Sequence, residues 1–362
     1  MNFDQRPFIV IWEVTQACDL VCLHCRACAQ PFRSPFELST QEGEHLIDQV
    51  AELAAPVFVL TGGDPLKRPD IYHLVEYGTQ AGVRTSMTPS ATPLLTREAI
   101  ARLQRCGLAR LAVSLDGSTP EIHDAFRGVL GSYALTLDAV RWAGELGLPV
   151  QINTTITRRN LGDFEPMVAL LKGLNIVLWS VFFLIPTGRA QTDDLISAEE
   201  FEQVFEKLDA ISQDVRFDIK TTEAQHYRRF LAQKRAELRR RNSLPPPHEK
   251  FKGLHDAIGR APRGINDGKG FVFISHYGEA YPSGFLPVSA GNIRHQPLPD
   301  IYRNAPLFRA LRDSSNLKGK CGVCEFRELC GGSRSRAFAL TGDPFAEDPS
   351  CIYQPRALAA AS

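Results

Sequence analysis

Three cysteines near the start of the chain, Cys18, Cys22 and Cys25, have the chemistry and the spacing of a metal site. One loop can bring all three thiols to a small, soft metal centre. A [4Fe–4S] cluster has one more iron than three thiolates can ligate, and that open iron can bind and activate a small molecule. The alternative is a zinc site. A zinc site needs a fourth ligand, and His24 is poorly placed for that role because it lies between two of the thiols in sequence.

Four further cysteines, near the other end of the chain, form a second candidate metal site: Cys321, Cys324, Cys330 and Cys351. Four thiols can saturate one iron–sulfur cluster, which then suits electron transfer or substrate positioning. A four-cysteine zinc site is the alternative, and the spacing alone does not exclude it. Of the other two cysteines, Cys28 is interpreted as a bystander of the first loop and Cys106 as a thiol at a helix end.

The elements that must position the first loop alternate between strand and helix. The predicted strands cover residues 8–14, 57–61, 83–87, 108–115, 149–155 and 177–185, and the predicted helices cover residues 40–54, 70–80, 97–106, 135–146 and 164–171. A helix over 199–211, a strand over 215–219 and a helix over 221–241 are expected next. Strands separated by helices indicate βαβ units and a parallel sheet, whose active sites lie at the carboxyl ends of the strands.

The second predicted strand ends in the turn Gly62-Gly63-Asp64-Pro65. Two adjacent glycines let a backbone approach a ligand closely or adopt a positive φ. The alternative is an ordinary turn between a strand and a helix. Both this turn and the first cysteine loop therefore fall at the expected active-site edge of the sheet.

The Cys-x3-Cys-x2-Cys loop after the first strand resembles the signature of the radical S-adenosylmethionine (SAM) superfamily, in which an aromatic residue or His, here His24, precedes the third cysteine. The resemblance implies an α/β fold, a partial (β/α)6 TIM-like barrel. It also implies that the open iron chelates the amino and carboxylate groups of SAM. One electron from the cluster then cleaves SAM to a 5′-deoxyadenosyl radical, which the protein must position and shield.

The same resemblance assigns contacts with SAM. In the family the turn usually has the sequence Gly-Gly-Glu-Pro and binds the amino group of the methionine part of SAM. Here Asp64 takes the place of the Glu and has a shorter side chain. Residues at the ends of the later strands touch the SAM carboxylate, ribose and adenine. The residues assigned in this way are His24, Gly62, Gly63, Asp64, Pro65, Ser114, Asp116, Asn153 and Ile185. The alternative is that Ser and Asp cap helices and that Asn fills a turn.

The C-terminal region begins with a predicted hairpin over 270–275 and 279–282 and resembles the SPASM/twitch extensions that carry auxiliary clusters. A full SPASM domain has seven cysteines and two clusters, but here Ser283 and Arg334 stand at two of the cysteine positions. We therefore expect two clusters in all: one open and one fully ligated auxiliary [4Fe–4S] cluster. The expected domains are the barrel over 1–242, a linker over 243–264 and the auxiliary-cluster domain over 265–362.

The segments 330–337, 341–344 and 347–351 resemble the branch of SPASM/twitch enzymes that act in haem and d-type haem biosynthesis, which also has subgroups of unassigned activity. The function predicted is hydrogen abstraction from an unactivated carbon, with a tetrapyrrole as substrate and propionate decarboxylation or elimination as the reaction. Arg334 and Arg336 could pair with propionates in a fork geometry, or they could pack against the loop of the auxiliary cluster.

Two other functions are weighed. The first is a maturase of ribosomal peptides, as many SPASM enzymes are; the short segment before the first strand leaves no room for an N-terminal peptide-recognition domain. The second, from another class, is a non-catalytic iron–sulfur electron-transfer protein. The glycine turn and the open cysteine loop argue against it. Release of 5′-deoxyadenosine would separate an enzyme from an electron carrier.

Composition sets the remaining expectations. The 362 residues allow one large domain and a smaller one, and a formal net charge of zero gives no field that would attract nucleic acid or a membrane. No apolar run is long enough to span a bilayer, and the N-terminus has no signal-peptide pattern. Nine cysteines without an export signal favour metal chemistry in a reducing cytoplasm. We expect a flavodoxin- or ferredoxin-type protein as the external one-electron reductant.

Overall fold

The computed structural model describes residues 1–241 and 264–359, and within them the strands form one sheet in the order β10-β9-β8-β1-β2-β3-β4-β5-β6-β7. The strands from β1 to β7 are parallel to their neighbours, as the alternation of strands and helices predicts. Their bounds are β1 Ile9–Glu13, β2 Val57–Thr61, β3 Thr85–Met87, β4 Arg110–Ser114, β5 Val150–Ile156, β6 Leu178–Phe183 and β7 Asp218–Thr222.

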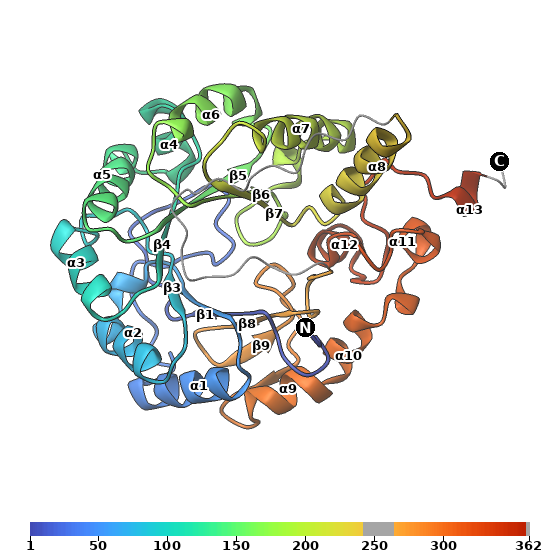
Figure 1. Cartoon of the computed structure of the whole chain (residues 1–362). Helices are drawn as coiled ribbons and strands as arrows, with labels where there is room; N and C mark the ends of the chain where they lie inside the picture. Colours follow the sequence, from blue (N-terminus) through green and yellow to red (C-terminus); the bar gives the residue numbers. More distant parts are fainter. Residues whose placement is uncertain (242–263, 360–362) are drawn as a thin grey trace.

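The helices between these strands cover the outside of the curved sheet (Figure 1). They are α1 Thr40–Glu52, α2 Ile71–Gln80, α3 Arg97–Arg105, α4 Pro120–Arg127, α5 Ser132–Glu145, α6 Phe164–Lys172, α7 Ala198–Ile211 and α8 Tyr227–Arg240. The first begins as its sequence predicts, because Ser39 and Glu42 form a reciprocal capping box. Trp12 of β1 is fully buried under this helix, and a Cβ at Gly43 would lie only 2.7 Å from its ring. The result is the expected partial barrel.

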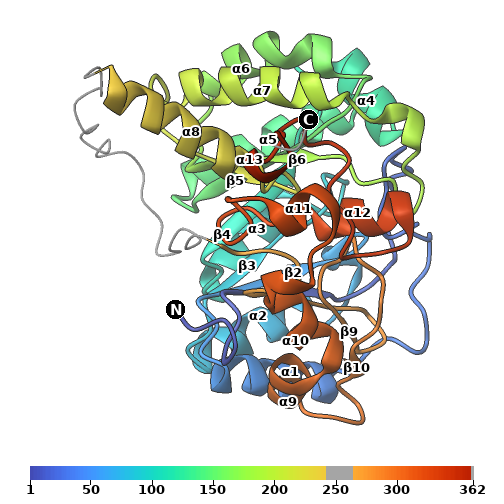
Figure 2. The same cartoon turned by 90° about the vertical axis from the view of Figure 1, so that its right-hand side faces the viewer.

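The C-terminal segment continues the same sheet and closes the open side of the barrel. Strand β8 (Phe271–Ile274) lies parallel to β1, and β9 (Glu279–Tyr281) and β10 (Gly291–Asn292) follow in antiparallel pairs. The helices are α9 Leu298–Asn304, α10 Pro306–Arg312, α11 Gly319–Val323, α12 Arg334–Thr341 and α13 Arg356–Ala359. Figure 2 shows α11 and α12 between α8, above them, and α10, below them.

Several predicted bounds differ from the structure. Residues 298–312 form two helices and not one, because Ala305 precedes Pro306 and is extended, with ψ of 133°. The strand expected over 215–219 lies at 218–222, where it pairs with β6, so the next helix starts only at Tyr227. Helix α4 was not predicted.

The predicted linker lies outside the described residues except for Gly264, and the predicted division into domains stays a prediction. Among the described residues, no helix combines the length and the apolar character that crossing a membrane requires.

Candidate active site

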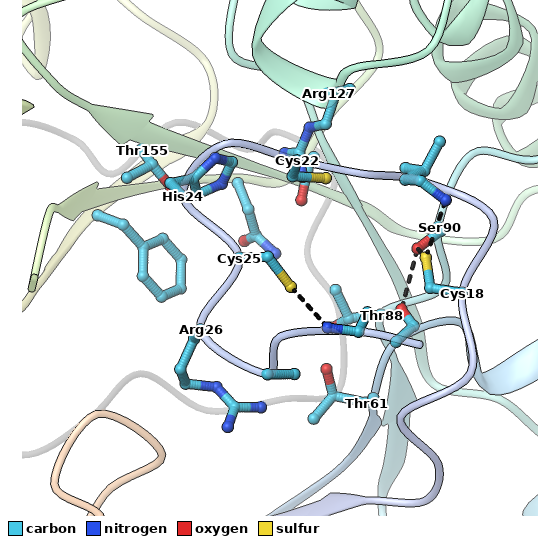
Figure 3. A pocket seen from close by; sticks show the side chains of 18 of the residues that line it. Cys18, Cys22, His24, Cys25, Arg26, Thr61, Thr88, Ser90, Arg127 and Thr155 are labelled. Atoms are coloured by element: carbon cyan, nitrogen blue, oxygen red, sulfur yellow. Dashed lines mark hydrogen bonds between the residues drawn. The ribbon is translucent and has the colours of Figure 1, made fainter. Parts of the chain in front are cut away.

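The first cysteine loop leaves β1 and crosses the carboxyl ends of the strands, as expected. Cys18, Cys22 and Cys25 line one cavity of about 210 Å³, and their sulfur atoms face a common space (Figure 3). Each sulfur accepts a hydrogen bond: from Leu20 N at 3.4 Å, from Arg127 Nη1 at 3.6 Å and from Ala29 N at 3.4 Å, respectively. Hydrogen bonds to sulfur are one of the means by which a protein tunes an iron–sulfur cluster.

The loop fits a cluster better than a single metal ion. Among the described residues, no three His, Cys, Asp or Glu side chains converge on one ion position, as a zinc site requires. Each thiolate of a [4Fe–4S] cluster ligates a different iron, so its thiols stand farther apart. His24 lines the same cavity, and its buried Nδ1 has no hydrogen-bond partner among the described residues. Burial, with help from Arg127 and Arg189, holds the pKa of His24 well below its ordinary value, so the imidazole is neutral.

The two glycines of the turn after β2 are needed for contact between two protein loops. A Cβ at Gly62 would lie 2.4 Å from Thr15 O, and one at Gly63 would lie 2.4 Å from Ala17 O. The two loops are joined by hydrogen bonds from Gly63 N to Thr15 O (2.8 Å) and from Asp64 N to Ala17 O (2.6 Å). Both glycines also line the cavity. They therefore bring the start of the cysteine loop against the edge of the site.

Asp64 is fully buried, and its carboxylate is engaged by the protein. It accepts hydrogen bonds from Thr92 Oγ1 (2.9 Å), Leu66 N (3.1 Å) and Ser90 N (3.4 Å). Burial raises its pKa to about 6. Neither Asp64 nor the next residue, Pro65, is part of the cavity wall, so the structure gives both a role in shaping the turn.

The other residues assigned to SAM divide into two groups. Ser114, Asn153 and Ile185 line the cavity, from β4, β5 and the segment after β6. Asp116 does not: it is fully buried, pairs with Arg127 and accepts a hydrogen bond from Thr155 N at 2.7 Å. Its position fixes Arg127, which lies against Cys22.

Two residues of this site were not assigned from the sequence. Ser90, after β3, lies 3.3 Å from Cys18 Sγ and donates to Gly63 O at 2.9 Å (Figure 3). Arg127 ends α4 and bridges Asp116 and Cys22. The sequence did carry one signal for Arg127, since it is followed by Gly128, whose φ of 71° ends the helix.

A second cavity, of about 220 Å³, lies inside the barrel and shares part of its wall with the first. The residues common to both are Arg26, Thr61, Thr88, Asn153, Phe182 and Phe285. Phe8, Phe271 and Phe273 add an apolar wall. Arg26 stacks 4.6 Å above the ring of Phe273 and pairs with Glu13, which also binds His276 at 2.7 Å. A flat apolar group with a charged edge is the kind of ligand that suits this barrel cavity.

The second group of cysteines also lines one cavity, beside α8. The wall contains Cys321, Cys324, Cys330 and Cys351. Sulfur atoms again accept amide hydrogen bonds, from Phe326 N to Cys324 at 3.4 Å and from Gly332 N to Cys330 at 3.4 Å. Burial raises the pKa of the Cys330 thiol to about 12, so a metal must displace its proton on binding.

Arg334 and Arg336 pack against the loop of the second cysteine site, as one of the two interpretations of the sequence expects. Arg334 is buried and donates to the carbonyls of Pro344 (2.9 Å) and Ala346 (2.6 Å) and to Cys321 Sγ (3.8 Å). Arg336 is fully buried and pairs with Asp348. Both guanidinium groups are thus engaged within the protein, and pairing with a substrate propionate is not favoured.

The two remaining thiols stand apart from both cavities. Cys28 is exposed and has a φ of 49°. Cys106 ends α3 at its C-cap, as a thiol at a helix end should. Neither is in the wall of either cysteine-lined cavity.

Comparison with known proteins agrees with this geometry. The family model described as Radical SAM superfamily matches residues 12–171. A protein of Methanosarcina barkeri named AdoMet-dependent heme synthase is 40% identical over 349 residues, which cover 96% of this chain and 97% of that protein. A protein of the same name from Nitratidesulfovibrio vulgaris is 39% identical, over 96% of this chain and 93% of that protein.

Solved structures show the same fold. Streptococcus suis SuiB bound to S-adenosylmethionine has a TM-score of 0.73 at 16% identity, covering 96% of this chain and 78% of that one. The structure of anSMEcpe with bound AdoMet has a TM-score of 0.67 at 14% identity, over 95% and 90% of the two chains.

The chain belongs to the radical SAM superfamily. It is an enzyme that uses a [4Fe–4S] cluster and SAM, and its C-terminal cysteines fit an auxiliary cluster. Its similarity to the AdoMet-dependent heme synthases extends over almost the whole chain, which agrees with the haem-biosynthesis interpretation of the sequence.

Proposed function

We propose that this enzyme converts propionate side chains of an iron tetrapyrrole into vinyl groups, as a haem synthase. The support is the identity of about 40% to proteins named AdoMet-dependent heme synthase, against 29% to a PqqA peptide cyclase, at equal coverage of this chain. A protein of Methanosarcina barkeri named Fe-coproporphyrin III synthase is also 29% identical. Resemblance to tetrapyrrole enzymes thus extends beyond one group of relatives.

Each cysteine group has a role in this proposal. Cys18, Cys22 and Cys25 hold the open cluster, and the N–H groups that reach their sulfurs stabilise the thiolate charge. When cluster and SAM are bound, they supply a 5′-deoxyadenosyl radical. The auxiliary cluster is held by Cys321, Cys324, Cys330 and Cys351.

The residues around the first cavity position SAM. Gly62 and Gly63 bring their backbone to the cavity wall for its methionine end, and His24, Ser114 and Asn153 offer polar groups from three other segments. Ile185 adds an apolar surface after β6, suited to the adenine. Asp64, Pro65 and Asp116 act indirectly, because they hold the turn and Arg127 in place.

The barrel cavity receives the part of the substrate that reacts. Its volume of about 220 Å³ gives room for a propionate-bearing edge of a tetrapyrrole. The phenylalanines of its wall match an aromatic macrocycle, and Arg26, on the wall shared with the SAM cavity, lies where the carboxylate must enter. Apolar surroundings also exclude water from a carbon radical.

The reaction balances as follows. A hydrogen atom leaves the propionate and forms 5′-deoxyadenosine. The bond to the carboxylate then breaks, carbon dioxide leaves, and a double bond forms between the two remaining side-chain carbons. One electron is left over, and the auxiliary cluster is the acceptor that the chain offers for it. A flavodoxin- or ferredoxin-type protein, in the cytoplasm, supplies the electron that starts each cycle.

The test is anaerobic turnover of the reconstituted enzyme with a chemical reductant, SAM and Fe-coproporphyrin III as the probe. We expect one 5′-deoxyadenosine for each propionate converted, with loss of the elements of formic acid from the porphyrin, measured by mass spectrometry. Cys22→Ala must abolish both products. The matched control is Cys28→Ala, because Cys28 is exposed and outside both cysteine-lined cavities.

Two results would contradict the proposal. Release of 5′-deoxyadenosine with an unchanged porphyrin, together with modification of a precursor peptide, would make the chain a peptide maturase. The absence of 5′-deoxyadenosine under every condition would leave only an electron-transfer role.

A further inference from the structure

Two buried carboxyl groups meet between the barrel and the second cysteine site. Glu223 follows β7 and is 5% exposed, and Asp267, on the segment before β8, is 4% exposed. Both side chains reach the start of α12, where Ser333 donates to Glu223 and Ser335 donates to Asp267. Glu223 also has a φ of 58°, a left-handed conformation that is unfavourable for a residue with a side chain. Such strain in an interior position often accompanies a functional constraint.

Within residues 1–241 and 264–359, the groups that donate hydrogen bonds to these two carboxyls are neutral serines. Ser333 Oγ donates to Glu223 Oε2 at 2.6 Å, and Ser335 donates to Asp267 Oδ2 from both N (2.7 Å) and Oγ (2.9 Å). Ser283, at a position where the seven-cysteine pattern has a thiol, is 3.5 Å from Glu223 Oε1. Arg336 reaches only the main-chain oxygen of Glu223, at 2.5 Å. Without a proton, the two carboxylates would therefore repel each other in a region of low dielectric.

One proton on the two carboxyls would leave the group of buried charged side chains around them without net charge. Three acids, Glu223, Asp267 and Asp348, lie with two guanidinium groups, Arg334 and Arg336, and all five are 5% exposed or less. Asp348 pairs with Arg336, which with other nearby groups lowers its pKa to about 2, so it is ionised. A single proton on the other two acids then makes the five side chains neutral as a group.

Other titratable groups lie on two sides of the pair. His226 is buried beside Asp348, and burial lowers its pKa to about 3, so it is neutral. On the opposite side, Glu223 lines the barrel cavity, where the charged wall residues are Arg26, Arg110 and Lys220. Burial and the neighbouring carboxyl raise the pKa of Glu223 to about 8, and burial raises the pKa of Asp267.

A short chain of hydrogen bonds connects this pair to the second cysteine site. Ser333, which binds Glu223, donates from its N to Asp348 Oδ2 at 2.8 Å, and Asp348 N donates to Cys321 Sγ at 3.5 Å. Because these hydrogen bonds are buried, a change of charge at Cys321 Sγ should change the electrostatic potential at the two carboxyl groups.

We propose that the proton shared by Glu223 and Asp267 is coupled to the electron that the auxiliary cluster accepts. When the cluster gains one electron, its added negative charge holds a proton on the pair, taken from solvent if the pair has lost it. When the cluster loses this electron, the pair can release the proton to solvent. This inference rests on the auxiliary cluster of the proposed function and is independent of the tetrapyrrole substrate.

The test is a potentiometric titration of the auxiliary cluster by electron paramagnetic resonance, without substrate. The protein is the Cys18/Cys22/Cys25→Ala variant, so that only one cluster is observed. On the acid side of about pH 8 the potential should be constant, and on the alkaline side it should fall. The full effect is a tenfold change in the reduction equilibrium per pH unit, about 59 mV for a one-electron couple.

Isosteric variants test whether the pH dependence of the reduction potential arises from these two carboxyl groups. Glu223→Gln and Asp267→Asn should each remove the pH dependence. The matched control is Glu279→Gln, a carboxyl-to-amide change on β9 of the same C-terminal segment, which should keep the slope. A constant potential in the protein with both acids, or a slope that persists in both variants, overturns the inference.

A second measurement does not depend on any variant. On the alkaline side of about pH 8, the infrared difference spectrum between oxidised and reduced protein should contain the carbonyl band of a carboxyl group that gains a proton on reduction, and its absence would overturn the inference. Neither measurement involves porphyrin, so failure here leaves the proposed haem synthase activity untouched, and failure of porphyrin turnover leaves the coupling intact.

Discussion

Substitution of Gly63 by alanine should release the first cysteine loop from the turn after β2. The new Cβ would lie 2.4 Å from Ala17 O and 2.6 Å from Gln16 O, where an ordinary contact needs at least 3.4 Å. The loops must then separate by about 1 Å, and neither oxygen can rotate away because both belong to the backbone. Metal–ligand distances tolerate only about 0.2 Å, so Cys18 would move beyond that limit.

The loss in the free energy of unfolding follows from the contacts that Gly63→Ala disrupts. Overpacking of this kind costs about 1–3 kcal/mol. The hydrogen bonds from Gly63 N to Thr15 O and from Asp64 N to Ala17 O are strained as well, at about 0.5–1.5 kcal/mol each. We therefore expect Gly63→Ala to lower the free energy of unfolding by about 2–6 kcal/mol.

The assay combines urea unfolding with iron and sulfide analysis after anaerobic reconstitution. Gly63→Ala should lose stability and the iron of the first cluster while the second cluster stays. The control is Gly162→Ala, because nothing lies within 4 Å of its Cβ and it should change stability by less than about 1 kcal/mol. Wild-type stability together with full iron content in Gly63→Ala would refute the tight contact between the two loops.

Three further predictions concern other residues of the site. Arg127→Met leaves the buried carboxylate of Asp116 unpaired and should destabilise the protein by about 3–5 kcal/mol in urea unfolding, whereas the exposed Arg141→Met should have no measurable effect. The pKa of Asp64 is raised from 3.8 to about 6, so the folded state binds its proton more tightly than the unfolded state. The contribution of Asp64 to stability should then fall by about 3 kcal/mol as the pH rises through this interval, and stay constant above it. That dependence should appear in the difference between wild type and Asp64→Asn, and equal slopes in the two proteins would contradict it. Cys28→Ala should keep the full iron content, and a loss of iron would give this exposed thiol a part in the first cluster.

The residues that could be predicted are those whose function depends on neighbours in sequence. The three thiols of the first loop lie within eight residues, and alternation of strands and helices placed that loop at the carboxyl edge of the sheet. Gly62 and Gly63 line the cavity, and their contact with SAM stays a prediction. Their closest neighbours, however, are the carbonyls of Thr15 and Ala17, a contact that depends on how two loops meet.

The residues that were missed act over long distances in sequence. Ser90 is 72 residues from Cys18, and Arg127 is 105 residues from Cys22, and no local pattern marks either contact. Glu223 and Asp267 were missed for the same reason, since they come together only when the C-terminal segment closes the barrel. Arg334 and Arg336 had two interpretations because burial, which decides between them, is a property of the fold.

The central claim is that two separate cysteine groups hold two clusters, of which only the first cleaves SAM. The most direct measurement is the iron content and the release of 5′-deoxyadenosine, after anaerobic reconstitution, in wild type and in the Cys18/Cys22/Cys25→Ala variant. We predict about eight irons per wild-type chain and about four in the variant, with 5′-deoxyadenosine formed by the wild type alone. About twelve irons in the wild type, or SAM cleavage by the variant, would contradict this account.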